Sequence, residues 1–360
     1  MNKKIIIIST IISVIVVLLI LGIIFYITGI NPVNRNNSTD KIIEIEEKTR
    51  TEGILNILKE QNLIRNTFVA KMYIKLNGIK GLQAGKYQLN ESMSLEEILK
   101  KISSGEVYDE TVKITFKEGK NIRWIAKTIA EKTDNNEDTV YTLLKDKEYI
   151  QSLIDKYWFL TDTITDEDIY YPLEGYLYPD TYIFESKSVS VKTIFNIILN
   201  QTDKVLTKYK SQIEVSGKSI HEILTIASII ELEGNDNEAR KGISSVIYNR
   251  LKANMSLGSD VTTYYAAKID MGERNLYKSE INTYNKYNTR GPNMNGKLPI
   301  GPVSNPSEES IAAALNPDNT DYLYFVADSN GKIYFTKTYA EHQQLIANLQ
   351  KQGLWYEYDN

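Results

Sequence analysis

Two glutamates, Glu231 and Glu233, close a long apolar run and are the side chains of this sequence best placed for acid-base chemistry. Glu231 follows Ala227 by one helical turn, so it lies against the apolar body of the run. A carboxyl group there loses hydration, which disfavours its charged form and raises its pKa. A raised pKa is what a general acid needs near neutral pH. The sequence therefore predicts Glu231 as a proton donor.

The pattern around the glutamates predicts a helix from about Ile220 to Glu233. Ser219 and Glu222 form a capping box at its start, and Gly234 with the polar residues after it marks its end. Almost no polar face exists, which is typical of a helix buried on all sides. Its apolar residues are Ile223, Leu224, Ile226, Ala227, Ile229, Ile230 and Leu232.

The two glutamates do not share a face of this helix, because positions two residues apart are separated by roughly 200°. A structural role for Glu231 is the alternative interpretation. Arg240 or Arg250 on the next expected helix could neutralise it. Structural ion pairs also perturb pKa values, so both interpretations stay open at this point.

Composition excludes several other chemistries. The chain of 360 residues has no cysteine, which excludes disulfides, iron–sulfur clusters and thiol nucleophiles. His221 and Glu222 begin like the zinc-protease motif HExxH, but Thr225 stands where the second histidine is needed, so no metal site is expected. No glycine-rich phosphate loop and no GxSxG motif is present, and we expect no cofactor. A net charge of −4 with mixed signs argues against a nucleic-acid partner.

The N-terminus predicts a membrane anchor. From Ile5 to Ile27 the chain is apolar apart from Ser9, Thr10, Ser13 and Tyr26, which is long enough to cross a bilayer core of ~30 Å. We expect one transmembrane helix over residues 5–28 that follows a cytoplasmic segment, 1–4. Lys3 and Lys4 place that segment inside the cell and the rest of the chain outside. A cleaved signal peptide is the alternative, but the run is too long and has no small-residue cleavage pattern.

After a polar linker at residues 29–40, the chain is expected to fold as α+β in two parts. Residues 41–110 form a small module, and residues 111–360 form a larger mixed domain around the central buried helix. In the module we expect a strand at Ile42–Ile45, a helix beginning near Ile54, a helix at Thr67–Leu76, a strand at Lys86–Leu89 and a helix capped by Ser94.

In the larger domain the pattern predicts a strand, several helices and a hairpin. The expected segments are a strand at Thr111–Phe116, a helix around Trp124, a helix within Asp138–Trp158, an irregular functional segment at Met255–Asn305, a helix beginning at Ser307, a hairpin at Tyr322–Thr336 and a last helix capped by Thr338.

The segment Tyr170–Phe184, YYPLEGYLYPDTYIF, is unusually rich in tyrosine. Rings with polar edges are suited to stacking on sugars, so this segment is expected either to wall a sugar site or to act as a tyrosine-rich scaffold.

Several separated motifs give a specific resemblance. ASIIELEG (227–234), LEGYLYPDTY (173–182), SDVTTYY (259–265) and YNT (287–289) with the later LPIGPVSNP run resemble the endolytic murein transglycosylases of the MltG/YceG family. The resemblance covers the chain from the linker onward. It implies a membrane-anchored enzyme with a LysM-like module at 41–110 and a catalytic domain that cuts peptidoglycan glycan strands internally. Peptidoglycan is the implied partner, together with the wall-synthesis machinery.

The resemblance also implies site residues. The catalytic glutamate of the ASIIE segment is Glu231. Asp260 lies in a motif that in the family usually has Gln before Ser-Asp and Pro after it. In this chain Gly258 replaces the Gln and Val261 replaces the Pro. The residues expected to contact substrate are Ser228, Glu233, Asn249, Asp260, Tyr287 and Asn288.

One carboxylate suffices for a lytic transglycosylase, because the C6 hydroxyl of the muramic acid attacks C1 in place of water. Glu231 would protonate the leaving oxygen and then accept the hydroxyl proton. A hydrolysing muramidase is one alternative, and it needs a second carboxylate such as Glu233, Glu174 or Asp260 at about 5–10 Å. A non-catalytic wall-binding scaffold is the other.

We expect the full chain to stay with membranes and the part from Asn31 onward to be soluble, since apolar density falls after Ile30. Washing membranes with high salt should leave the full chain in the pellet, because a helix in hydrocarbon is not held by charge. Release by salt alone would contradict the spanning helix.

Overall fold

The structure is a computed structural model that describes residues 3–355. The chain divides between Glu110 and Thr111 into two compact units. Each unit has its own hydrophobic core.

The first unit begins with the long helix α1, Lys3–Ile30. Its segment Ile6–Ile30 has a mean hydropathy of 3.2 and is long and apolar enough to cross a membrane. At its C-terminal end, Tyr26 and Ile30 pack on the core of the small module. Gly29 lies so close to Val69 that a Cβ on Gly29 would fall 2.8 Å from the valine methyl carbons. The end of α1 is therefore packed against the folded module.

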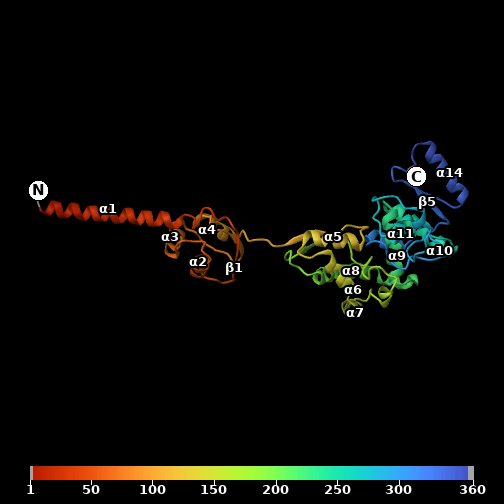
Figure 1. The fold of residues 1–360 in the computed structure, drawn as a ribbon, viewed down its shortest axis with the longest axis horizontal. Coiled ribbons are helices and arrows are strands. Elements are labelled where there is room, and N and C mark those ends of the chain that lie inside the picture. The colour runs from red at the N-terminus through yellow and green to blue at the C-terminus, as the bar shows by residue number, and fades with distance from the viewer. Residues whose placement is uncertain (1–2, 356–360) are drawn as a thin grey trace. The chain divides into compact units, whose positions relative to one another are not determined.

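The small module has the order β1-α2-α3-β2-α4 (Figure 1). Its elements are β1 Lys41–Ile45, α2 Thr51–Glu60, α3 Thr67–Leu76, β2 Gly85–Leu89 and α4 Leu95–Ser104. The two strands pair antiparallel, with Lys41 opposite Leu89 and Ile45 opposite Gly85. The predicted capping box of α4 is confirmed.

The first half of the second unit contains a two-stranded sheet and five helical segments. These elements are β3 Val112–Thr115, α5 Ile122–Lys132, α6 Glu137–Lys145, α7 Lys147–Lys156, the 3₁₀ segment η1 Asp162–Thr165, β4 Thr181–Phe184 and α8 Val191–Ser216. Strands β3 and β4 pair antiparallel, with Val112 opposite Phe184. Asp146 separates α6 from α7, because its extended backbone ends one helix while its side chain accepts from Tyr149 N to cap the next.

The tyrosine-rich segment is mostly buried. Tyr176 is fully buried, and Tyr182 and Phe184 lie in the core, where the strand β4 places them. The expectation of a sugar-facing wall is therefore wrong for these rings, and the scaffold interpretation holds for them. Tyr170, Tyr171 and Tyr178 keep partial exposure.

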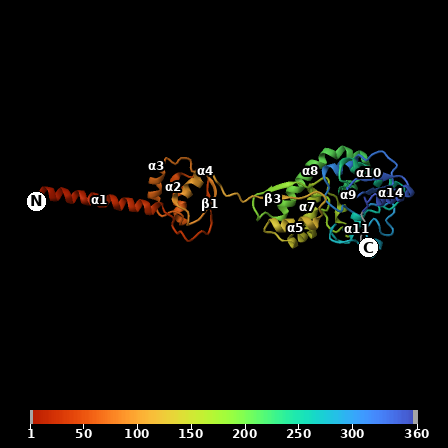
Figure 2. The same cartoon turned by 90° about the horizontal axis from the view of Figure 1, so that it is seen from above.

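The second half of the unit is built around α9. Its elements are α9 Ile220–Glu233, α10 Asn237–Lys252, α11 Asp260–Ala266, α12 Lys278–Asn282, α13 Glu308–Leu315, β5 Tyr324–Ala327, β6 Ile333–Thr336 and α14 Tyr339–Lys351. In both views α5 to α8 lie toward one end of this unit, and α9 to α11 lie with α14 toward the other (Figures 1 and 2).

Helix α9 has the predicted limits and the predicted capping box at Ser219 and Glu222. Its residues from Ile220 to Ile230, apart from Glu222, are buried, and α10, α11 and α13 pack against it. The prediction of a helix buried on all sides is confirmed. Apart from Glu222 in the first turn, the partly exposed positions of α9 lie in its last turn, and that turn carries both glutamates.

Candidate active site

Glu231 and Glu233 face different neighbours. Glu231 contacts α10 and α13, whereas Glu233 contacts the segment that precedes α11. This divergence follows from their separation of roughly 200° around the helix axis. The two carboxylates therefore have separate environments.

Glu231 is held by four polar contacts. Its Oε2 accepts hydrogen bonds from Ser307 N at 2.9 Å, from Ser310 Oγ at 2.7 Å and from Ser307 Oγ. Arg240 Nη2 lies 3.6 Å from its Oε1, and the Glu231 side chain is only 6% exposed. All of these partners donate hydrogen bonds or carry positive charge, so they stabilise the carboxylate ion. The contact with Arg240 matches the structural alternative raised from the sequence.

These contacts make Glu231 a junction of three helices. Ser307 is the N-cap of α13, and its side chain also accepts from Ser310 N. A carboxylate at a helix N-terminus is favoured by the helix dipole as well as by the free N–H groups there. Arg250, the other cation considered, instead donates to Leu323 O and Leu257 O.

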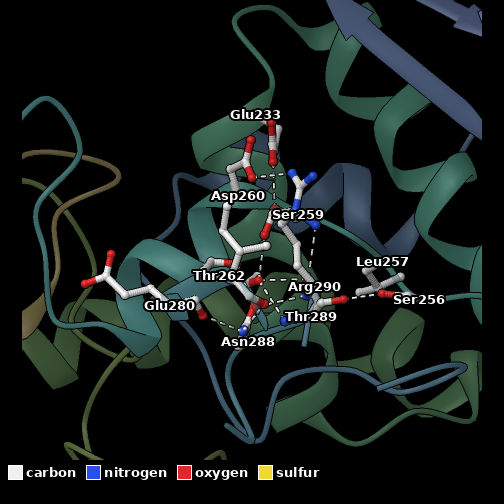
Figure 3. A network of polar contacts seen from close by, with 12 residues as sticks. Glu233, Ser256, Leu257, Ser259, Asp260, Thr262, Glu280, Asn288, Thr289 and Arg290 are labelled. Carbon is white, nitrogen blue, oxygen red and sulfur yellow. Dashed lines mark hydrogen bonds and ion pairs between the residues drawn. The ribbon is translucent and has the colours of Figure 1, made fainter. Parts of the chain in front are cut away.

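Glu233 is also shielded from water, as the sequence predicted for Glu231. Among the residues that the structure describes, its hydrogen-bond partner is Ser259, whose Oγ donates to Oε1 at 2.7 Å (Figure 3). Burial raises the pKa of Glu233 to about 7, and the negative charge of Asp260 acts in the same direction. The Ser259 hydrogen bond and the charges of Arg290 and Arg250 act against the increase. Glu233, like Glu231, stands at a partly exposed position at the end of α9.

Asp260, the first residue of α11, forms a salt bridge with Arg290 (Figure 3). Both side chains are exposed, at 49% and 39%. Before them, Gly258 adopts a left-handed backbone with φ +60°, where a side chain would be strained. The glycine that departs from the family pattern thus shapes the turn that delivers Ser259 to Glu233.

Buried hydroxyls hold this turn in place. Thr289 Oγ1 accepts from Ser259 N at 3.1 Å and lies 2.7 Å from Thr262 Oγ1. The carbonyl of Thr289 accepts from Gly258 N at 3.2 Å. The YNT segment therefore fixes the position of Ser259, which in turn orients the Glu233 side chain.

Asn288 is likewise buried beneath this turn and holds the neighbouring backbone in place. It is 1% exposed, its Oδ1 accepts from Thr263 Oγ1 at 2.7 Å, and its Nδ2 donates to three carbonyls, including that of Thr283 at 2.8 Å. With both polar atoms engaged and the residue buried, it cannot contact a glycan in this structure. Its position supports a structural role instead.

Three more expected contact residues are engaged in contacts within the protein, and Asn249 alone of the three is partly exposed. Ser228 is fully buried and bonds to Thr225 O and Val303 N. Tyr287 is buried against Tyr170 and Tyr265. Asn249 donates to Thr320 O and Tyr322 O, which fastens the chain leading to the C-terminal hairpin. Sequence alone could not distinguish these supporting positions from contact positions.

Beside the last turn of α9 lies a hollow of about 350 Å³. Leu232 and Val261, the neighbours in sequence of the glutamates and of Asp260, line it together with Trp124 and Tyr264. Trp124 and Tyr264 are partly exposed, and such rings can stack on sugar faces. Neither ring, nor Ser259 or Arg290, was singled out from the sequence as a site residue, although Ser259 adjoins Asp260.

Glu174 does not supply a second carboxylate at this site. It is 2% exposed, and its oxygens accept from Ile122 N at 3.0 Å and from Tyr265 OH at 2.9 Å. Burial raises its pKa to about 7. Its contacts fasten the start of α5 to α11, which favours a structural role over that of a muramidase carboxylate. Among residues with described side chains, no cluster of three His, Asp or Glu could hold a metal ion.

A carboxyl group with a raised pKa at the end of a buried helix is a candidate site for acid–base chemistry. The chain belongs to the YceG-like family, whose model matches residues 43–348. A crystal structure of a yceG-like protein from Listeria monocytogenes is similar at 34% identity with a TM-score of 0.61, over 85% of this chain and 99% of that one.

Two relatives are named endolytic murein transglycosylase. The protein from Bacillus subtilis (strain 168) is 38% identical over 321 residues, which cover 88% of this chain and 86% of the relative. The protein from Streptococcus pneumoniae (strain D39 / NCTC 7466) is 31% identical over 335 residues, 88% of this chain and 59% of the relative.

The pKa of Glu233 predicts a pH effect on stability. The folded-state pKa is about 7 against an ordinary 4.5, so between these values the folded chain keeps a proton that the unfolded chain has lost. The free energy of unfolding should therefore fall as the pH rises through this window, by up to ~1.4 kcal/mol per pH unit for one proton. Glu233→Gln should remove this contribution, so the variant gains stability relative to wild type from pH 5 to pH 8.

Thermal unfolding of both proteins at several pH values, in the same detergent, measures this difference. If the melting temperatures of wild type and variant changed with pH in the same way, the pKa of Glu233 would not be raised by folding.

Proposed function

We propose that this protein is a membrane-anchored lytic transglycosylase that cuts the β-1,4 bond between MurNAc and GlcNAc within peptidoglycan strands. Family membership and the names of the relatives support the class of reaction. The observation that carries the chemistry is Glu233 at the end of the buried helix α9, where burial raises the pKa of its carboxyl group to about 7 and Ser259 orients it.

The resemblance implied Glu231 as the general acid, and the contacts favour its neighbour. A proton donor must be protonated near neutral pH and must be within reach of the substrate oxygen. Glu233 has one hydrogen-bond donor and a raised pKa. Glu231 has three hydrogen bonds and a cation around its carboxylate. We therefore propose Glu233 as the acid, with Glu231 as the alternative.

In the proposed reaction Glu233 donates its proton to the glycosidic oxygen as the bond from C1 of MurNAc to that oxygen breaks. The C6 hydroxyl of the same sugar then bonds to C1 and returns its proton to Glu233. The products are a free 4-hydroxyl on GlcNAc and a 1,6-anhydroMurNAc end, so no water is consumed. Tethering of the nucleophile supplies the large advantage of an intramolecular reaction.

Asp260 and Ser259 have supporting roles in this proposal. Ser259 orients the Glu233 carboxyl through its 2.7 Å hydrogen bond. Asp260 is half exposed beside the site and can stabilise positive charge that develops on the sugar ring. The nearness of Asp260 also keeps the muramidase alternative open, because it is a second carboxylate that could activate water.

We further propose that the small module is LysM-like and binds glycan, supported by the order β1-α2-α3-β2 and the antiparallel pairing of its two strands. Helix α1 would anchor the protein in the cell membrane with Lys3 and Lys4 inside, so that both folded units lie outside the cytoplasm. The apolar segment Ile6–Ile30 supports this placement.

Digestion of purified glycan in ¹⁸O-labelled water separates the reaction types. A lytic enzyme should give fragments that end in 1,6-anhydroMurNAc, lighter by one water than hydrolysis products and free of label. Labelled reducing ends as the main product would favour a muramidase that uses Asp260. Absence of any cleavage by the folded full chain would favour a binding scaffold.

A further inference from the structure

A second hollow, of about 880 Å³, opens in the larger unit away from the glutamates. Helices α6 and α7 line it together with the segment from Ile164 to Pro172 and with Lys268, which follows α11. Its volume falls in the range of ~300–1,000 Å³ that is typical of ligand sites. Nothing in the proposed cleavage step uses it.

The lining combines apolar and aromatic surface. Leu144, Ile150 and Ile164 are buried in the core, so the hollow has an apolar base. Tyr141 and Tyr171 pack with ring centroids 5.9 Å apart and keep partial exposure. This lining can receive small alkyl groups while offering hydroxyl groups for hydrogen bonds.

Charged side chains of both signs surround this lining. They are Asp138, Lys145, Lys147, Asp166, Glu167 and Lys268. Among the residues whose side chains the structure describes, none of these six forms a salt bridge. The exposed Lys145 and Lys147 come from the junction of α6 and α7, and the exposed Asp166 and Glu167 come from the segment after η1. Lysines and carboxylates without salt-bridge partners around one hollow complement a ligand that carries both signs.

Lys268 strengthens the case for a built site. Its backbone is in the left-handed region at φ +57°, which is uncommon for a residue with a side chain. Its ammonium lies 4.3 Å from the centroid of the Tyr170 ring, which holds the charge at the edge of the hollow.

We propose that this hollow binds the stem peptide of peptidoglycan, an inference that rests on the proposed function. A stem peptide carries carboxylates on its glutamate and its last residue, an amine or a second zwitterionic group on its third residue, and methyl groups on its alanines. The lysines of the junction would pair with carboxylates and the acidic side chains with the amine, while the apolar base receives the methyl groups.

The position of the hollow relative to the cut fits this occupant. Helix α11 has Asp260 at its start, and Tyr170 of the hollow donates to Ala266 O at its end, at 3.0 Å. Seven helical residues span ~10 Å. An extended peptide covers ~3.5 Å per residue, so a stem peptide on a sugar near the cut can reach the hollow.

Binding of the synthetic peptide L-Ala-γ-D-Glu-L-Lys-D-Ala to the full chain in detergent, measured by calorimetry, tests the site directly. Wild type should bind it, and the double variant Lys145→Gln/Lys147→Gln should bind roughly fivefold more weakly or worse, since two charge contacts are lost. Lys127→Gln, on the exposed face of α5, is the matched control and should bind as wild type. No peptide binding, or binding of a chitin tetrasaccharide at the same residues instead, would overturn the proposal.

A second measurement compares cleavage of peptide-bearing and peptide-free glycan. Wild type should prefer the peptide-bearing strands, and the double variant should lose that preference while cutting peptide-free strands as wild type does. Equal use of both substrates by wild type would overturn the peptide site but leave the proposed function intact. Absence of cleavage with peptide binding retained would contradict the proposed function instead.

Discussion

Placing two carboxylates in the last turn of a buried helix is the constraint on which the rest of the larger unit depends. Removing a carboxylate from water costs several kcal/mol unless partners replace the lost hydration. At Glu231 the replacement is nearly complete, because the start of α13 and Arg240 converge on it. At Glu233 it is not, since Ser259 is the one donor to the carboxyl group within residues 3–355. One helix thus carries two carboxyl groups two residues apart with different numbers of polar partners.

The different partners of the two carboxyl groups explain the conformations of the neighbouring segments. Helix α13 must present its N-cap serine to Glu231, which fixes the chain that leads from the irregular segment into that helix. The turn before α11 must present Ser259, which requires the left-handed Gly258 and the buried hydroxyls of Thr262 and Thr289. The YNT motif therefore acts as a support for the acid. Its asparagine is fully engaged by the backbone of its own loop and by Thr263.

Local signals predicted much of the fold correctly. The capping boxes at Ser94, Ser219 and Thr338 each marked a helix start, because a cap is decided by residues three positions apart. The 26-residue helix α8 was not predicted, since its apolar stripe is shared with polar residues and its packing partners lie far along the chain. The burial of Tyr176 was missed for the same reason. Tyrosine is common both at surfaces and in cores, so its presence in the sequence does not predict burial. Tyr176 is buried because it packs against His221 and Phe159, which lie elsewhere in the chain.

The roles of the glutamates show the limit of sequence reasoning most clearly. The sequence correctly located a helix end with two carboxyl groups in apolar surroundings. It could not tell which carboxyl group finds its partners, because Ser307, Ser310 and Ser259 lie 26 to 79 positions away. Both carboxyl groups lie in apolar surroundings, and burial raises the pKa of Glu233.

The central proposal, that Glu233 is the proton donor and that Glu231 has a structural role, is tested most directly by comparing Glu233→Gln with Glu231→Gln. Cleavage of purified glycan should fall at least about 100-fold in Glu233→Gln, the low end for loss of a general acid, with a circular dichroism spectrum like that of wild type. Glu231→Gln should lower the melting temperature, because the junction of α9, α10 and α13 loses its charge, yet keep measurable cleavage per folded molecule. Near wild-type cleavage by Glu233→Gln, with a folded but inactive Glu231→Gln, would contradict the account and return the catalytic role to Glu231.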